Sequence, residues 1–288
     1  MAASTNATGR LPASKGLLRP EEFAQRVSFD EVPASGPAAR WVERVWSSRW
    51  DLPEGSVLTT SLLPHPAVEL TIERGELSRA GHTGDGVWLT GVVSHRFDVT
   101  LRGRGGVVGM KFRSGGFTAW SGVSAHRLTD RVVPAAERLA DTESLRRLEL
   151  SASDSAAALR DFVEQRADAA GPIPELVDRV MTLLRQPALT RVDALAERCD
   201  CSIRTLQRTL RRYVGVGPKW LVRRHRMHDA VAALDAGATE GLADLAARLG
   251  WYDQSQFARD FVRLVGVSPG AYRDRSRTGT GRAGLADS

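Results

Sequence analysis

The sequence is poor in the residues that mark disulfide-rich, metal-binding or membrane-spanning proteins. Only two of the 288 residues are cysteines, Cys199 and Cys201, and their C-x-C spacing would strain a disulfide. No further thiol or imidazole stands near them at zinc-finger spacing, so we expect no metal and no cofactor. Neither a signal-peptide core nor a spanning apolar segment is present, which predicts no membrane partner. Two free thiols fit a reducing cytoplasm.

Patterns of catalytic residues are also scarce. The histidines His65, His82, His95 and His126 are scattered, with no His-x-His pair for a metal-dependent barrel enzyme. The run at residues 102–106, Arg-Gly-Arg-Gly-Gly, is interpreted as a glycine-rich turn without a following helix start that could hold a phosphate. No nucleophile, base and acid follow one another in a catalytic order, so we predict that the chain is not an enzyme.

The chain contains one sequence pattern in two copies. The first copy joins Leu195-Ala196-Glu197-Arg198 to Arg208 and Gly215-Val216-Gly217-Pro218; the second joins Leu245-Ala246-Ala247-Arg248 to Arg259 and Gly266-Val267-Ser268-Pro269. The leucines are 50 positions apart and the glycines 51, so the second copy has gained one residue near 250–253. Each copy has the layout of a helix-turn-helix.

Local signals fix the helices of each copy. In the first, Ser202 is a suitable N-cap for a helix over Ile203–Tyr213 with one apolar stripe: Ile203, Leu206, Leu210 and Tyr213. Gly215 favours a left-handed stop and Pro218 begins a bridging helix to about Leu234. In the second, Asp253 and Gln256 resemble a capping box before a helix that buries Phe257 and Phe261.

Charge is concentrated in the repeats. The chain has 40 basic and 34 acidic residues, net +6, and residues 171–277 hold 18 basic and 12 acidic, so the remainder is 22 against 22. Residues 201–228 contain eight basic side chains and no acid, which indicates phosphate contact with salt-dependent binding. The residues expected to contact DNA phosphates are Ser202, Thr205, Arg211, Arg212, Lys219, Arg223 and Arg263.

These motifs resemble the C-terminal DNA-binding domain of the AraC/XylS family of bacterial transcription regulators. The resemblance covers roughly residues 172–275 and is most specific around Gly250-Trp251, the run Asp253-Gln254-Ser255-Gln256-Phe257, and Tyr272-Arg273. It implies an all-α unit that places two recognition helices in adjacent major grooves. The positions it implies as base-reading are Arg204, Gln207, Arg208, Gln254, Ser255, Gln256 and Arg259.

The N-terminal half has a different periodicity. Short apolar alternations between about Trp41 and Phe112, separated by Gly, Pro and Asp-Gly, predict strands of a small barrel or sandwich. Helices are expected over residues 132–139 and 142–165. This half resembles, more weakly, the cupin-like sensor barrels that precede the DNA-binding domain in the same family. The expected fold class is therefore α+β and multidomain, a mainly-β barrel followed by an all-α tandem helix-turn-helix domain.

Together these observations predict a sequence-specific DNA-binding transcription regulator in the bacterial cytoplasm, associated with the nucleoid. The expected divisions are a flexible tail over 1–20, a sensor and dimerisation barrel over 21–167, a linker over 168–174, the DNA-binding domain over 175–276 and a tail over 277–288. Partners are double-stranded promoter DNA and, for an activator, RNA polymerase. A small-molecule effector and a second copy of the chain are further candidate partners. An architectural non-specific DNA binder and a cupin-type enzyme stay open as alternatives, and the ligand-binding residues are unknown.

Overall fold

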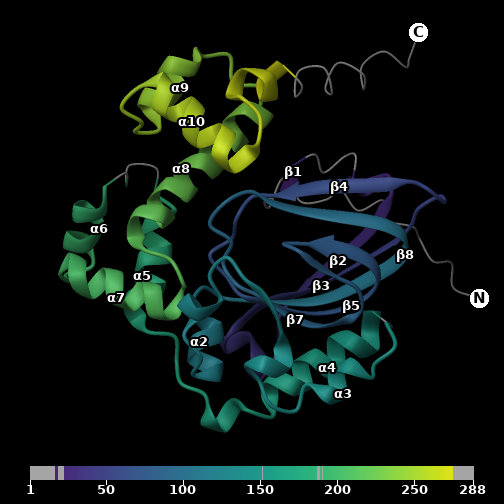
Figure 1. Ribbon diagram of the computed structural model, residues 1–288. Helices are drawn as coiled ribbons and strands as arrows, with labels where there is room; N and C mark the ends of the chain where they lie inside the picture. The colour runs from purple at the N-terminus through teal and green to yellow at the C-terminus, as the bar shows by residue number, and fades with distance from the viewer. Residues whose placement is uncertain (1–16, 19–22, 151, 187–188, 190, 275–288) are drawn as a thin grey trace, which may run out of the picture.

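The structure is a computed structural model that describes residues 17–18, 23–150, 152–186, 189 and 191–274. Strands fill the N-terminal half and helices the C-terminal half (Figure 1). The strands are β1 (Leu17–Leu18), β2 (Val27–Pro33), β3 (Val42–Asp51), β4 (Val57–Leu62), β5 (Glu69–Arg79), β6 (His82–Thr83), β7 (Gly86–Thr90), β8 (Phe97–Phe112) and β9 (Val132–Pro134). The predicted order, a mainly-β domain followed by an all-α one, is confirmed. The expected tails lie outside the described residues, apart from β1.

One long strand organises the β domain. The C-terminal half of β8 pairs with β3 on one side and with the start of β5 on the other, whereas its N-terminal half pairs with β4 and the end of β5. The expected glycine-rich turn at residues 102–106 is wrong, because this run lies in the middle of β8. The pairing of β5 with β8 shifts register after Gly75, whose φ is 89° and where a Cβ would collide with the Arg104 carbonyl.

Helices cover one face of this sheet. The α-helices here are α2 (Gly116–Ser121), α3 (Glu143–Arg146) and α4 (Ala152–Glu164), with short 3-10 turns η1 (Pro37–Arg40), η2 (Ala125–Leu128), η3 (Ala135–Glu137) and η4 (Ala167–Ala169). Leu70, Phe112 and Leu159 are fully buried between sheet and helices. The helix expected over residues 132–139 is wrong: its first residues form β9, which pairs with β7, and η3 follows.

The helical half consists of two lobes joined by one long helix. The first lobe contains α5 (Glu175–Leu184), α6 (Val192–Arg198) and α7 (Ile203–Tyr213); the second contains α9 (Leu242–Arg248) and α10 (Gln254–Val265). Between them runs α8 (Pro218–Asp235), which starts at the proline expected there and contributes to both apolar cores. None of the helices in the described part of the chain has the length and hydropathy that crossing a membrane requires.

The β domain also packs against both lobes. Val92 belongs to the apolar core of the first lobe, and Leu63 belongs to that of the second. Between them, the guanidinium of Arg224 on α8 is buried and donates to the Pro64 carbonyl at 2.7 Å and to His65 Nδ1 at 3.1 Å. Burial lowers the pKa of Arg224 to about 10, so its charge persists at neutral pH. The Arg224 guanidinium therefore links α8 to the β domain.

Candidate DNA-binding surface

The helix α7 is built so that one face is buried and the other is free. Ser202 Oγ accepts a hydrogen bond from the backbone N–H of Thr205 at 3.1 Å, which confirms the predicted N-cap. Leu206 and Leu210 are completely buried in the first lobe. The predicted stripe is only partly right, because Ile203 at the helix start remains 44% exposed. Outside that stripe, the three side chains expected to read bases are exposed: Arg204, Gln207 and Arg208.

The helix α10 repeats this design. Asp253 Oδ1 accepts from the backbone N–H of Gln256 at 2.7 Å, and Phe257 and Phe261 are completely buried. The return bond of a capping box differs from expectation, since Gln256 Oε1 accepts from the N–H of Tyr252 at 3.4 Å rather than from that of the cap residue. Its four expected base-reading side chains are exposed: Gln254, Ser255, Gln256 and Arg259.

The turns before the two helices differ by the inserted residue. Both turns contain a residue with positive φ directly after the buried end of the preceding helix, 52° at Asp200 and 84° at Gly250. Cys201 alone then separates Asp200 from the cap Ser202, whereas Trp251 and Tyr252 separate Gly250 from the cap Asp253. Trp251 is buried, so the extra residue on the surface is Tyr252, which is 94% exposed. Sequence reasoning located the insertion but not this side chain.

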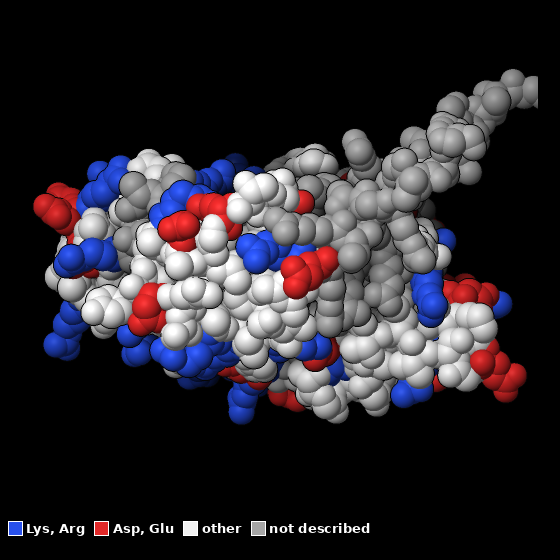
Figure 2. All heavy atoms as spheres, turned by 90° about the horizontal axis from the view of Figure 1, so that it is seen from above, with Lys and Arg blue, Asp and Glu red and all other residues white. Residues whose placement is uncertain are grey.

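Most of the residues expected to contact phosphates are accessible. Exposed ones are Ser202, Arg211, Arg212, Lys219 and Arg263. Thr205 is half-buried, with its hydroxyl 3.0 Å from that of Ser202, and Arg223 is half-buried with its Nη1 3.6 Å from Asp260. Figure 2 shows Lys and Arg over the helical half, at the left of the view, interspersed with fewer acidic side chains along its lower edge.

The acid-free basic run is not uniformly a surface feature. Arg224 faces the β domain, as described above, and is 8% exposed. The Arg226 guanidinium stacks over the Trp251 ring at 4.6 Å from its centroid and donates to the Gly250 carbonyl. These two cations therefore hold elements together, and the interpretation of the whole run as phosphate-binding is wrong for both. Because Arg224 and Arg226 are two positions apart on α8, they cannot both lie on the same face of the helix.

The far ends of both recognition helices meet the β domain. Thr118 Oγ1 donates to the Arg212 carbonyl at 3.1 Å, and Thr129 Oγ1 donates to the Gly215 carbonyl at 2.7 Å, so carbonyls at the C-terminus of α7 are satisfied from outside the lobe. At the C-terminus of α10, the Arg96 guanidinium fills the space beside Gly266. Both helices thus point their capped N-terminal turns away from these contacts.

The two cysteines take no part in this surface chemistry. Cys199 is buried in the first lobe and Cys201 is half-buried, and both are free thiols. Burial raises the pKa of each thiol, which keeps them protonated and unreactive at neutral pH. Within the described residues, His, Cys, Asp and Glu form no group of three or more that could coordinate a metal ion.

Two capped helices with exposed Arg and Gln side chains define a DNA-binding domain of the tandem helix-turn-helix class. Residues 195–275 match the family of the helix-turn-helix domain, and residues 30–134 match a domain of unknown function, DUF6597. The first match covers the residues that resemble the AraC-type helix-turn-helix domain in the sequence. This match supports a DNA-binding transcription regulator.

Solved structures with similarity to the chain include two isolated domains. The C-terminal domain of AraT, a response regulator from Geobacillus stearothermophilus, is 25% identical over 35% of this chain and 86% of its own, with a TM-score of 0.33. The DNA-binding domain of AdpA, a global transcriptional factor solved with a target DNA, is 28% identical over 36% and 93%, with a TM-score of 0.33.

A longer similarity is to ToxT from Vibrio cholerae O395, solved with (E)-4-(8-methylnaphthalen-1-yl)but-3-enoic acid. It is 10% identical over 87% of this chain and 99% of that one, with a TM-score of 0.42. None of the curated proteins matches the chain.

Proposed function

We propose that this regulator is sequence-specific and inserts α7 and α10 into adjacent major grooves of promoter DNA. Arg204, Gln207 and Arg208 read bases from the first helix, and Gln254, Ser255, Gln256 and Arg259 read them from the second. Arginine forks match guanine and glutamine amides match adenine in the major groove. The action is binding without a catalytic step.

The observation that carries this proposal is the exposure of all seven base-reading side chains on two N-capped helices. A purely electrostatic binder needs only cations, and three of the seven residues are glutamines, which add hydrogen-bonding pattern but no charge. Their placement in the first turns of α10 and at the middle of α7 therefore supports base readout over non-specific attraction.

The length of the bridging helix supports simultaneous engagement. The 18 residues of α8 span about 27 Å at 1.5 Å per residue. Successive major grooves on one side of B-DNA are about 34 Å apart. α7 packs on the start of α8, around Leu221 and Val222, and α10 packs on its later turns, from Met227 to Leu234. This offset along α8 supports a separation that suits two neighbouring grooves.

The test begins with DNA fragments selected from the native genome by the full-length protein. Arg208→Ala and Arg259→Ala should each lower affinity for the selected site by about 1 to 3 kcal/mol, roughly 5- to 150-fold, measured by fluorescence anisotropy. Affinity for a scrambled duplex should fall much less, because a base contact carries the specificity and phosphate contacts carry the rest.

Two matched controls separate readout from charge. Arg263→Ala removes an exposed arginine from the same helix α10 and should weaken selected and scrambled DNA alike, lowering the salt slope by about 1. Arg147→Ala removes an exposed cation of the β domain and should change neither the affinity for selected DNA nor that for scrambled DNA. Equal losses on both duplexes for Arg208→Ala and Arg259→Ala would show that the protein binds DNA without reading it.

The remaining parts of the proposal concern the whole chain. We assign residues 21–167 to a sensor and dimerisation unit, 168–174 to a linker and 175–276 to the DNA-binding unit. We also propose that a ligand or partner at the first unit modulates DNA binding, and the packing of this unit against both lobes supports this. Promoter DNA places the protein in the cytoplasm with the nucleoid, and RNA polymerase is a further partner if transcription is activated. Sedimentation with and without DNA distinguishes monomer from homodimer.

A further inference from the structure

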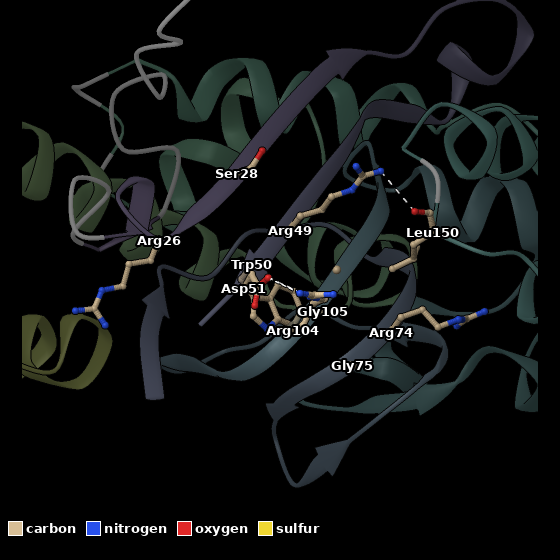
Figure 3. A pocket seen from close by; sticks show the side chains of 11 residues that line it. Arg26, Ser28, Arg49, Trp50, Asp51, Arg74, Gly75, Arg104, Gly105 and Leu150 are labelled. Carbon is tan, nitrogen blue, oxygen red and sulfur yellow. Dashed lines mark hydrogen bonds and ion pairs between the residues drawn. The ribbon is translucent and has the colours of Figure 1, made fainter. Parts of the chain in front are cut away.

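The outer face of the β domain contains a groove whose chemistry the DNA-binding surface does not use. Its volume is about 840 Å³, and its lining includes Arg49, Arg74, Arg104, Asp51 and Leu150 (Figure 3). Arg26 also borders it but points away from the other arginines in Figure 3. We call the part formed by Arg49, Arg74, Arg104, Gly106 and Leu150 the arginine groove.

Strand register brings its two central arginines together. Gly106 of β8 pairs with Arg49 of β3 on one side and with Arg74 of β5 on the other. Residues directly opposite in neighbouring strands point to the same face, so the three form one row with a glycine in the middle. A Cβ on Gly106 would lie 3.2 Å from Leu150 Cδ1 and 3.5 Å from Arg49 Cγ. The missing side chain therefore leaves the hollow between two guanidinium groups.

Several arginines of the domain form ion pairs with an acid, and the two at the ends of this row do not, within the described residues. Arg44 pairs with Glu31, Arg96 with Asp98 and Arg166 with Asp141, at 2.7 to 3.3 Å. In the groove, Arg104 pairs with Asp51 at 2.8 Å. Among the described residues, by contrast, Arg49 and Arg74 have only main-chain carbonyls as hydrogen-bond partners. Carbonyls orient a guanidinium but carry no compensating charge.

These carbonyl contacts also prepare the site. Arg74 is held by the carbonyls of Glu73, Arg146 and Leu148 at 2.6 to 2.8 Å, so little side-chain entropy remains to be lost on binding. Arg49 has one weak contact, from Nη2 to the Leu150 carbonyl at 3.5 Å, so within the described residues most of its N–H groups are available to a ligand. Apart from Arg26, which points away, the charged lining residues are Arg49, Arg74, Arg104 and Asp51, with a net charge of +2.

We propose that the arginine groove binds a small molecule through an oxyanion, a phosphate or a carboxylate, with Arg49 as the principal donor and Arg74 as the fixed second cation. The guanidinium fork suits both oxyanions, which it can bind through two parallel hydrogen bonds. Leu150 offers an apolar edge to the remainder of such a molecule. This site lies outside the DNA-binding surface. The proposed ligand of the β domain is therefore a small molecule that carries a phosphate or a carboxylate.

The test titrates the full-length protein with inorganic phosphate and, separately, with benzoate, at ionic strength held constant with sodium chloride. Arg49→Gln should weaken binding of the preferred anion about tenfold or more in calorimetry, because one charge-assisted fork is lost. The anion affinity of Arg49→Lys should lie between those of the parent and Arg49→Gln, because lysine keeps the charge but lacks the guanidinium fork. Arg147→Gln, an exposed arginine outside the groove, is the matched control and should bind like the parent.

Anion binding at the DNA surface is common to all these variants, so only the difference caused by Arg49 reports the groove. Preference for phosphate indicates a phosphorylated ligand, and preference for benzoate indicates a carboxylate. The proposal is overturned if Arg49→Gln binds both anions as the parent does, or if the parent binds neither up to about 10 mM, the weak end of the affinity range. Should Arg49→Gln not fold, Gly106→Ala is the second test. It adds a methyl group between the two guanidinium groups and retains every charge, so it must weaken anion binding. Because DNA plays no part in this titration, its failure leaves the proposed DNA function untouched.

Discussion

At the scale of single residues, the most informative side chain is the tyrosine that the second repeat has gained. Tyr252 is 94% exposed and lies directly before the cap of α10, which three of the proposed base-reading residues follow. A phenol in the turn before a recognition helix can contact the sugar-phosphate backbone through its ring and its hydroxyl.

We therefore expect Tyr252→Ala to weaken DNA binding about fivefold, roughly 1 kcal/mol, on selected and scrambled duplexes alike. Its unfolding free energy should stay within about 0.5 kcal/mol of the parent, because the ring contributes to the surface and not to the core. Tyr252→Phe separates the two contributions: full recovery assigns the effect to the ring, and no recovery assigns it to the hydroxyl. Unchanged anisotropy titrations for Tyr252→Ala would mean that this side chain does not reach the DNA.

Residue types alone could not show which cations of the basic run lie on the surface and which contact other parts of the protein. Arg223, Arg224 and Arg226 stand within four positions, yet one reaches Asp260, one the β domain and one an indole ring. The sequence shows charge and helical phase, but which face of α8 is covered depends on a domain more than a hundred residues away. The groove arginines were missed for the same reason, since register pairs them across β3, β8 and β5.

At the scale of helices and strands, local chemistry predicted what depends on neighbours in sequence. The bounds of α7 and the proline start of α8 follow from a cap, a stripe and a proline, all within a few residues. The sequence-based prediction of strands was wrong where the contact that determines the strand is distant in the sequence. The glycines of 102–106 resemble a turn in the sequence, but Gly105 is needed in the folded sheet because a Cβ there would collide with the Trp50 ring.

The cap of the first recognition helix gives a prediction at this scale. Ser202→Ala removes the acceptor for the Thr205 N–H, so the free energy of unfolding should fall by about 1 kcal/mol in urea denaturation. Ser255→Ala is the matched control, because this serine lies in the exposed first turn of α10 and does not cap a helix there. Equal stability of Ser202→Ala and Ser255→Ala would contradict a stabilising role for the cap.

At the scale of the whole molecule, the β domain and the helical half share an ionisable interface around Arg224. His225 and His228 follow on α8, and the His228 ring lies 5.7 Å from that of His65 in the β domain. Arg224 and Arg185 face His225, whereas Arg224, His225 and Lys111 of β8 face His228. Burial, followed by these cations, lowers the pKa of His225 to about 4 and that of His228 to about 3.

This interface should make the protein less stable in mild acid. The folded-state pKa values lie below the ordinary value of 6.5, so the unfolded chain binds protons that the folded chain does not. Stability is therefore retained above pH 6.5 and declines as the pH falls toward 4. Between pH 7 and pH 5 each histidine should contribute a loss of roughly 1 to 2 kcal/mol in urea denaturation. His228→Gln should remove its share of this dependence, and the matched substitution of the exposed His95 should not. If His228→Gln loses as much stability as the parent between these two pH values, the buried interface does not control the response to acid.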